Sequence, residues 1–148
     1  MDSLLSSIEK YRLELESIGS EPPPAPRWNQ DWFPRLDAAA AYATVRETRP
    51  RRIVEVGSGH STRFLARAVA AGRLETRITA IDPEPRASIS GLKVDWLRSP
   101  VERLQTFPRL EPDDILFIDS SHQLKPGNDV DFLLNKVIPR LPAGVRMH

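Results

Sequence analysis

A glycine turn flanked by two acidic side chains is the first place in this sequence where chemistry could occur. In "IVEVGSGHST" (residues 53–62), Glu55 comes just before Gly57 and Gly59, and Asp82 closes the next apolar run. A strand that ends in Gly-x-Gly and opens a helix gathers backbone N–H groups at one spot, and glycine lets a ligand come close. The segment therefore predicts a nucleotide site.

Three details of this turn indicate which nucleotide it would hold. Thr62 stands where the dinucleotide pattern has its third glycine, and no Gly-Lys-[Ser/Thr] follows as in a P-loop. Glu55 would repel a phosphate and attract a cation. Asp82 stands where an acid reaches ribose hydroxyls in this architecture. Together they favour a cationic nucleoside without phosphates, and S-adenosylmethionine fits because its sulfonium and amino groups are positive.

A second group of reactive side chains follows a later apolar run, in "DDILFIDSSH". Asp119 and His122, with Ser120 and Ser121 between them, are the catalytic candidates. An Asp and a His at the carboxyl end of a sheet could deprotonate an acceptor hydroxyl or amine, or ligate a divalent ion. Methyl transfer itself needs mainly alignment of the reactants. Two ligand types in one loop are a weak metal signal, so no metal site is predicted.

Strands that alternate with helices must position these residues. Strands are expected over residues 51–56, 76–82, 91–99, 113–119 and 144–148. Helices are expected over residues 3–18, 36–45, 61–72 with Ser61 as N-cap, 100–107 and 127–141. This alternation predicts an α/β fold of three layers, a Rossmann-like doubly wound and mainly parallel sheet with helices on both faces.

Three stretches resemble class I S-adenosylmethionine-dependent methyltransferases. "VEVGSGHST", "AIDPEP" and "DDILFIDSSH" are similar to the first, second and fourth motifs of that family, within a resemblance that covers residues 35–148. "FIDSSHQLKPGNDVDF" further resembles a small-molecule subgroup with Asp-x-x-His after the fourth strand. The family's sheet has seven strands, so the C-terminal strands are expected to be missing here and the chain to be a piece of a longer protein.

The resemblance implies a role for each matching residue. Glu55 and the backbone of residues 57–61 would hold the methionine portion, Asp82 the ribose, and residues 99–102 would lie along the adenine. Asp119 would face the methyl donor and the acceptor. The implied cofactor-binding set is Glu55, Gly57, Ser58, Gly59, His60, Ser61, Asp82, Pro83, Ser99, Pro100, Val101, Glu102 and Asp119.

Structural roles remain open for the same side chains. Glu55 could cap a helix or pair with an arginine, and Asp82 could only shape the turn before Pro83. His60 could contribute its backbone alone, and His122 could simply cap its loop. Two alternatives to a methyltransferase also remain: a non-catalytic Rossmann-like nucleotide-binding or scaffold module, and an NAD-dependent oxidoreductase, which Thr62 and Glu55 disfavour.

Composition and charge limit the partners. Residues 1–27 are expected to form an N-terminal helix and a proline-rich linker ("EPPPAP"), and residues 28–148 the S-adenosylmethionine-binding domain. The helix could pack on the domain, pair two copies in a homodimer or cover the site as a lid. The net charge of +1 gives no case for nucleic acid or membrane as a partner, and the 148 residues contain no cysteine. With no export signal, a cytoplasmic location and a small-molecule acceptor are expected.

Overall fold

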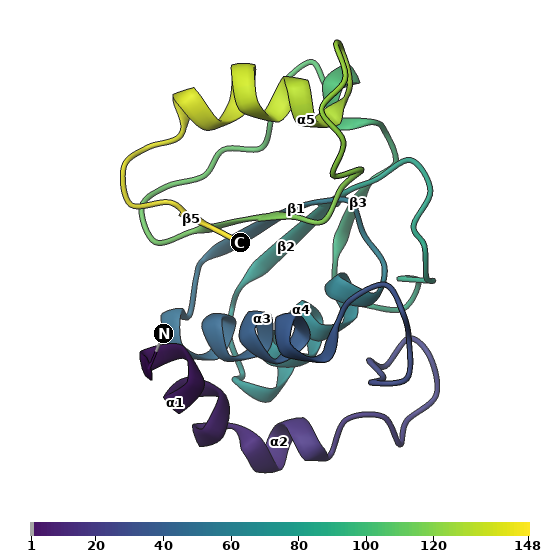
Figure 1. Cartoon of the computed structure of the whole chain (residues 1–148), viewed down its shortest axis with the longest axis vertical. Helices are drawn as coiled ribbons and strands as arrows, with labels where there is room; N and C mark the ends of the chain where they lie inside the picture. The colour runs from purple at the N-terminus through teal and green to yellow at the C-terminus, as the bar shows by residue number, and fades with distance from the viewer. Residues whose placement is uncertain (1) are drawn as a thin grey trace. The chain divides into compact units, whose positions relative to one another are not determined.

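The apolar runs predicted as strands form one parallel sheet. The protein is described by a computed structural model that covers residues 2–148. Its strands are β1 (Arg52–Val56), β2 (Arg77–Ile81), β3 (Asp95–Leu97), β4 (Ile115–Ile118) and β5 (Arg146–Met147). They lie in the order β3-β2-β1-β4-β5, and all neighbours are parallel (Figure 1). The connections run outward from β1 in one direction and then start again at β4 on its other side. Parallel sheets bind ligands at such a reversal, at the carboxyl ends of the strands.

The chain folds as two compact units. The sheet unit contains residues 50–58, 76–85 and 94–148, and the helical unit contains residues 2–49, 59–75 and 86–93. The chain passes from the first to the second between Ser58 and Gly59, inside the glycine turn. This division places the strands and the first residues after each strand in the sheet unit, and residues 59–75 and 86–93 in the helical unit.

One face of the sheet is covered within its own unit. Short helical segments α5 (Asp129–Phe132), η2 (Leu133–Val137), η3 (Ile138–Arg140) and η1 (Val101–Arg103) carry the covering side chains. The buried cluster consists of Val54, Val56, Ile81, Val101, Leu110, Leu116, Leu133 and Val137. Because successive side chains of a strand alternate between faces, Val54 and Val56 point to this cluster and Glu55 points to the opposite face.

The helical unit is built around small and aromatic side chains. Its helices are α1 (Asp2–Lys10), α2 (Arg12–Glu16), α3 (Arg35–Thr48) and α4 (His60–Ala71). Residues 38–43 of α3 are all buried, and five of the six are alanines, so neighbouring helices can approach this helix closely. Phe64 of α4 is completely buried, with its ring centroid 4.9 Å from that of Trp28 and 6.1 Å from that of Phe33.

The N-terminal helix is broken, contrary to the single helix predicted over residues 3–18. The break is at Tyr11, whose N–H lies within hydrogen-bonding distance of both Ser7 O and Ile8 O. The Tyr11 side chain is buried and its hydroxyl donates to Glu47 of α3 at 2.6 Å. Anchoring this ring on α3 accounts for the turn between α1 and α2.

Three other predicted elements are shorter or less regular than expected. β3 pairs with β2 only along residues 95–97, so residues 91–94 are not strand. The helix predicted over residues 100–107 is the single 3₁₀ turn η1, because Leu104 is already extended. The helix predicted over residues 127–141 divides into α5, a π-helical η2 and a 3₁₀ η3. Pro139 accounts for the division, since it lacks an N–H and its ring clashes with the preceding turn of an α-helix.

The start of α4 also differs from the prediction. Gly59, not Ser61, is the N-cap residue, with a φ of 141° that is outside the helical range. The Gly59 N–H donates to Thr62 Oγ1 at 2.9 Å. The residue that replaces the third glycine of the dinucleotide pattern therefore caps this helix, a role that its side chain can perform and a glycine cannot.

The two tyrosines give a spectroscopic test of the helical unit. Burial, together with the hydrogen bond to Glu14, raises the pKa of Tyr42 to about 12. Burial and the bond to Glu47 also raise the pKa of Tyr11. Since both phenols have a higher pKa in the folded state than their ordinary value of about 10, their contribution to stability is complete below pH 10. It is lost as the pH rises towards 12.

Ultraviolet absorbance of tyrosinate during a pH titration will check this. The chain contains two tyrosines, Tyr11 and Tyr42, so the whole tyrosinate absorbance comes from these two side chains. In denaturant both should ionise near the ordinary value, about 10. A tyrosine of the folded protein that ionises at or below that value would contradict the packing of α1 and α2 on α3.

Candidate functional site

The ends of β1 and β4 meet through a backbone contact that requires glycine. Gly57 has a φ of 86°, and a Cβ atom added to it would lie 1.9 Å from the carbonyl oxygen of Asp119. Its N–H donates to Ile81 O at 3.0 Å, and the Asp119 N–H donates to Val56 O at 2.9 Å. The residue after β1 is thus held against the residue after β4, at the point where the strand order reverses.

The side chain of Asp82 closes the other side of this turn. Ser58 Oγ donates to Asp82 Oδ2 at 3.0 Å, and both side chains are buried. The Glu84 N–H donates to Asp82 Oδ1 at 2.7 Å, which is the local turn bond proposed as the structural alternative. A carboxylate has about four lone-pair sites, so two further hydrogen bonds can be accepted. Asp82 thus shapes its turn and retains the capacity to bind two hydroxyl groups.

Glu55 lies below this edge rather than on it. It is completely buried, and its neighbours in register are Ala80 on β2 and Phe117 on β4. Burial of a carboxylate is costly unless it is hydrogen-bonded. The Glu55 side chain does not lack such a partner, and it lies on the face of the sheet opposite to Val54 and Val56.

The loop after β3 divides between the core and the edge of the sheet. Ser99 Oγ donates to Pro100 O at 3.1 Å, and Glu102 is half-buried. The Val101 side chain is 3% exposed and packs in the core beneath α5. Pro83 O, in the adjacent loop, accepts a long bond of 3.4 Å from Arg98 Nε. The side chain of Val101 is thus used for packing, whereas Ser99 and Glu102 retain exposure to solvent.

Asp119 and His122 are neighbours in the loop after β4. The distance from His122 Nε2 to Asp119 Oδ1 is 3.3 Å, and the two side chains are 63% and 20% exposed, respectively. His122 has a φ of 56°, in the left-handed region that non-glycine residues rarely adopt. Such backbone geometry costs about 1–3 kcal/mol and is concentrated at functional sites.

Asp129 fixes this loop, a role that the sequence reasoning missed. Its carboxylate accepts bonds from Ser121 N at 2.8 Å and Ser121 Oγ at 2.7 Å. Burial disfavours ionisation of Asp129, but the hydrogen bonds to its carboxylate, those from Ser121 foremost, together outweigh burial and hold its pKa below the usual value. Asn128 caps α5 by accepting from Asp131 N. The spacing from Ser121 to Asp129 matches no recognised motif. In the sequence, only Asn128, a typical N-cap residue, indicates that a helix begins beside Asp129.

Gly59, His60 and Ser61 belong to the helical unit, at the start of α4. A Cβ on Gly59 would lie 3.0 Å from Ala87 N, so this glycine too is closely approached. His60 is 7% exposed, and its Nδ1 has no hydrogen-bond partner within residues 2–148. Burial, and then the positive charges of Arg63 and Arg27, lower the pKa of His60. The ring is therefore held neutral, with one nitrogen unused beside a helix N-terminus.

The predicted site residues thus fall into distinct groups. Contacts within the sheet unit bring Gly57, Ser58, Asp82 and Asp119 to one edge, with His122 beside Asp119. Glu55 and Val101 have buried side chains, and residues 59–61 start a helix in the other unit. Among residues 2–148, no group of three His, Asp or Glu side chains is arranged to hold a metal ion. No described helix combines the length and apolar character needed to cross a membrane.

The sequence of the chain matches the family model described as a methyltransferase domain over residues 54–148. Because this match covers more than half of the chain, the protein belongs to that family of methyltransferase domains. The match confirms the methyltransferase resemblance of the glycine turn and of the loop after β4, and it begins two residues inside β1.

A solved structure agrees with the fold. The crystal structure of the SAH-bound methyltransferase PaMTH1 from Podospora anserina superposes with a TM-score of 0.56 and 20% sequence identity. The match covers 99% of this chain and 61% of that protein. At this identity the likeness confirms the Rossmann-like α/β fold. No curated protein matches the chain.

Two glycine substitutions distinguish the loss of stability caused by the close contact at Gly57 from the loss caused by a left-handed backbone alone. Gly127 also has a left-handed φ, 77°, but a Cβ there would meet nothing within 4 Å. Gly127→Ala should lower the free energy of unfolding by about 1–2 kcal/mol, the usual cost of this backbone region. Gly57→Ala adds a collision with the Asp119 carbonyl and should cost more than about 3 kcal/mol or prevent folding.

Urea unfolding followed by circular dichroism measures both values. Similar small losses for the two variants would show that β1 and β4 do not approach each other as closely as described.

Proposed function

We propose that this chain is a domain that transfers a methyl group from S-adenosylmethionine to a small-molecule acceptor. The observation that carries the proposal is the convergence of Gly57, the Ser58–Asp82 pair and Asp119 at the carboxyl edge of the sheet, where the strand order reverses. Membership of a methyltransferase domain family supports it, as does the shared fold with an SAH-bound methyltransferase.

The residues at this edge suit S-adenosylmethionine. Glycine at position 57 keeps the backbone bare where the loops after β1 and β4 meet, and Asp82 can still accept two hydroxyl donors. In the helical unit, the unused Nδ1 of His60 and the first N–H groups of α4 suit a polar, carboxylate-bearing group. Buried polar atoms in proteins are nearly always paired, so an unpaired one is suited to a ligand.

Each residue then has a specific task in binding. Asp82 accepts hydrogen bonds from the ribose hydroxyls, and residues 57–61 hold the methionine portion through their backbone. The Glu55 carboxylate favours a positive charge above it. Residues 99–102, with Pro83, lie along the adenine. When bound, the cofactor supplies a methyl group already activated by the sulfonium, so the protein mainly aligns the acceptor.

Asp119 and His122 manage the proton of the acceptor. With Nε2 carrying the proton that faces Asp119 Oδ1, the Nδ1 atom of His122 is free to accept a proton from a hydroxyl or amine. The neighbouring carboxylate stabilises the imidazolium that results. Asp129 positions this pair indirectly, because it fixes Ser121, the residue before His122.

Substitutions at Asp82 and His122 should affect different steps. Asp82→Asn keeps a carbonyl for the Glu84 N–H but removes one acceptor, so the affinity for S-adenosylhomocysteine should fall at least about tenfold. Asp95→Asn, at an exposed acid that pairs with Arg77 on neighbouring strands, is the matched control and should bind as the wild type does. His122→Gln should retain binding and lose turnover.

Isothermal titration calorimetry with S-adenosylhomocysteine gives the affinities. Turnover is the consumption of S-adenosylmethionine in the presence of a small-molecule extract. Unchanged binding by the Asp82→Asn variant would overturn the proposed ribose contact. Binding by the wild type without any turnover would instead favour the non-catalytic scaffold, and stabilisation by NAD alone would exclude the methyltransferase.

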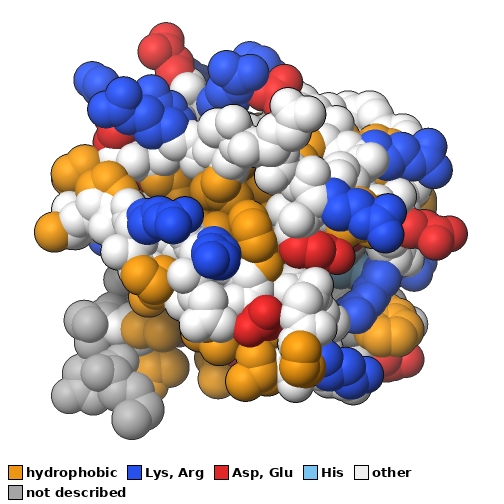
Figure 2. Space-filling view, turned by 90° about the horizontal axis from the view of Figure 1, so that it is seen from above, with side chains coloured by type: hydrophobic (Ala, Val, Ile, Leu, Met, Phe, Trp, Pro, Cys, Tyr) orange, Lys and Arg blue, Asp and Glu red, His pale blue; other side chains and the backbone are white. Residues whose placement is uncertain are grey.

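The remaining expectations belong to the same proposal. The face drawn in Figure 2 carries basic, acidic and hydrophobic side chains intermixed, which is compatible with a small acceptor. A polyanion such as nucleic acid would favour a continuous basic surface. The domain boundary after residue 27 and the cytoplasmic location stay predictions from the sequence. We also propose that two copies of the chain pair through the N-terminal helix.

A further inference from the structure

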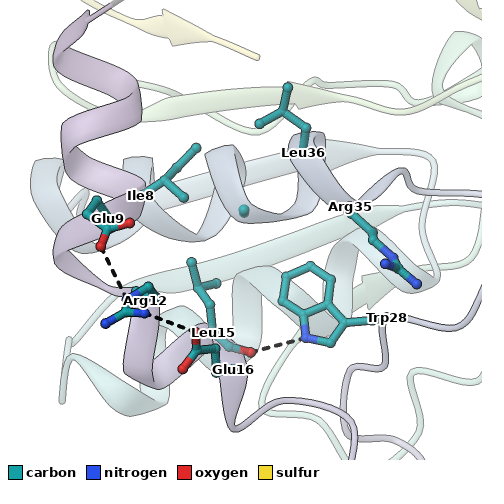
Figure 3. A pocket seen from close by; sticks show the side chains of 9 residues that line it. Ile8, Glu9, Arg12, Leu15, Glu16, Trp28, Arg35 and Leu36 are labelled. Atoms are coloured by element: carbon teal, nitrogen blue, oxygen red, sulfur yellow. Dashed lines mark hydrogen bonds and ion pairs between the residues drawn. The ribbon is translucent and has the colours of Figure 1, made fainter.

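A groove with an apolar floor runs between α1, α2 and α3 in the helical unit (Figure 3). Its volume is about 670 Å³. Apolar side chains form most of the lining, from Ile8, Leu15, Trp28, Leu36 and Ala39. The Trp28 indole donates its N–H to Leu15 O at 3.1 Å, so this wall of the groove is fixed by a hydrogen bond.

The rim of the groove exposes large apolar side chains. Leu36 is 62% exposed, and Leu5, one turn before Ile8 on the same face of α1, is 53% exposed. Apolar side chains gathered along one groove indicate a binding surface, whereas exposed apolar residues scattered singly do not. A small molecule in the groove would fill the floor but leave these leucines in water, whereas a protein surface would cover both.

The charges around the groove are separated between its two sides. Arg12 pairs with Glu9 at 3.2 Å and with Glu16 at 3.6 Å, so these three side chains together carry one net negative charge. Arg35 stands on the opposite side of the groove (Figure 3). It forms no ion pair or hydrogen bond with any residue from 2 to 148. It also lies in the first turn of α3, where the helix dipole disfavours a cation.

This arrangement of charges allows two copies of the groove to face each other with opposite charges in contact. A twofold axis that lies in the interface and runs along the groove, between its two sides, places the Arg35 side of one copy over the Glu9 and Glu16 side of the other. Two such contacts form, and the apolar rims face each other between them. In a closed dimer with this symmetry, the same surface serves both copies.

We infer that this groove is the site where a second copy of the chain docks, with Arg35 of each copy against Glu9 and Glu16 of the other. The inference rests on the proposed pairing through the N-terminal helix and specifies its surface, its residues and its orientation. It does not depend on methyl transfer, because each groove residue lies outside the sheet unit.

Leu36→Glu tests the apolar rim. The variant places a charge in the covered surface and should convert a dimer into a monomer in sedimentation equilibrium, with an association constant at least about a hundredfold lower. Leu13→Glu is the matched control: Leu13 is 75% exposed, lies on α2 and does not line the groove. It should leave the dimer intact, and both variants should keep the wild-type circular dichroism.

A charge exchange tests the orientation without placing a charge in the apolar rim. Arg35→Glu alone and Glu16→Arg alone should each weaken the dimer, because like charges then face each other across the axis. The double variant restores opposite charges and should recover most of the lost affinity. Binding of S-adenosylhomocysteine, measured on the same samples, reports separately on the proposed function.

Several outcomes would overturn the inference. A wild type that is monomeric at every concentration excludes the dimer. If anilinonaphthalene sulfonate then binds the wild type but not the Leu36→Glu variant, the groove takes an apolar small molecule instead. A dimer that tolerates Leu36→Glu, or that Leu13→Glu disrupts equally, uses another surface. A double charge variant no tighter than the single ones excludes the proposed orientation.

Discussion

The contact between the Gly57 and Asp119 backbones is the constraint on which the candidate site depends. A side chain at position 57 would have to occupy the space of the Asp119 carbonyl group. Only a glycine allows the loops after β1 and β4 to meet, and the same left-handed geometry turns the chain towards Ser58 and the carboxylate of Asp82. The absence of one Cβ atom therefore brings together residues from three strands that are neighbours in the sheet and distant in the sequence.

Much of this fold could be predicted from apolar runs. β1, β2 and β4 lie within one or two residues of their predicted bounds, because strands buried on both faces leave a continuous apolar signal. The exposed edge strand β3 and the helix after Asn128 were predicted less well. Their bounds depend on pairing length and on how the turn before Pro139 adapts, which residue types alone do not determine.

The part of the candidate site that could be predicted is the part that strand order determines. Asp82 follows β2 and Asp119 follows β4, the two strands that flank β1 in the parallel sheet. Their proximity to the glycine turn after β1 therefore follows once the strands are recognised. The bonds of Asp129 to Ser121 were not predictable, because they depend on the path of an irregular loop. The burial of Val101 was not predicted either. Its motif position lies next to polar residues, yet its side chain packs in the core beneath α5.

The hydrogen bonds from Ser121 to Asp129 determine which parts of this loop can change in sequence without moving the site. Asn128 Nδ2 also donates to Gln123 O. Hydrogen bonds therefore fix the loop both before residue 124, at Ser121 and Gln123, and after residue 126, at Asn128 and Asp129. Leu124, Lys125 and Pro126 project into solvent. Changes of side chain confined to these three positions would leave Asp119 and His122 in place. Evolution or directed mutagenesis could therefore vary the surface beside the reactive pair while the pair itself stays aligned.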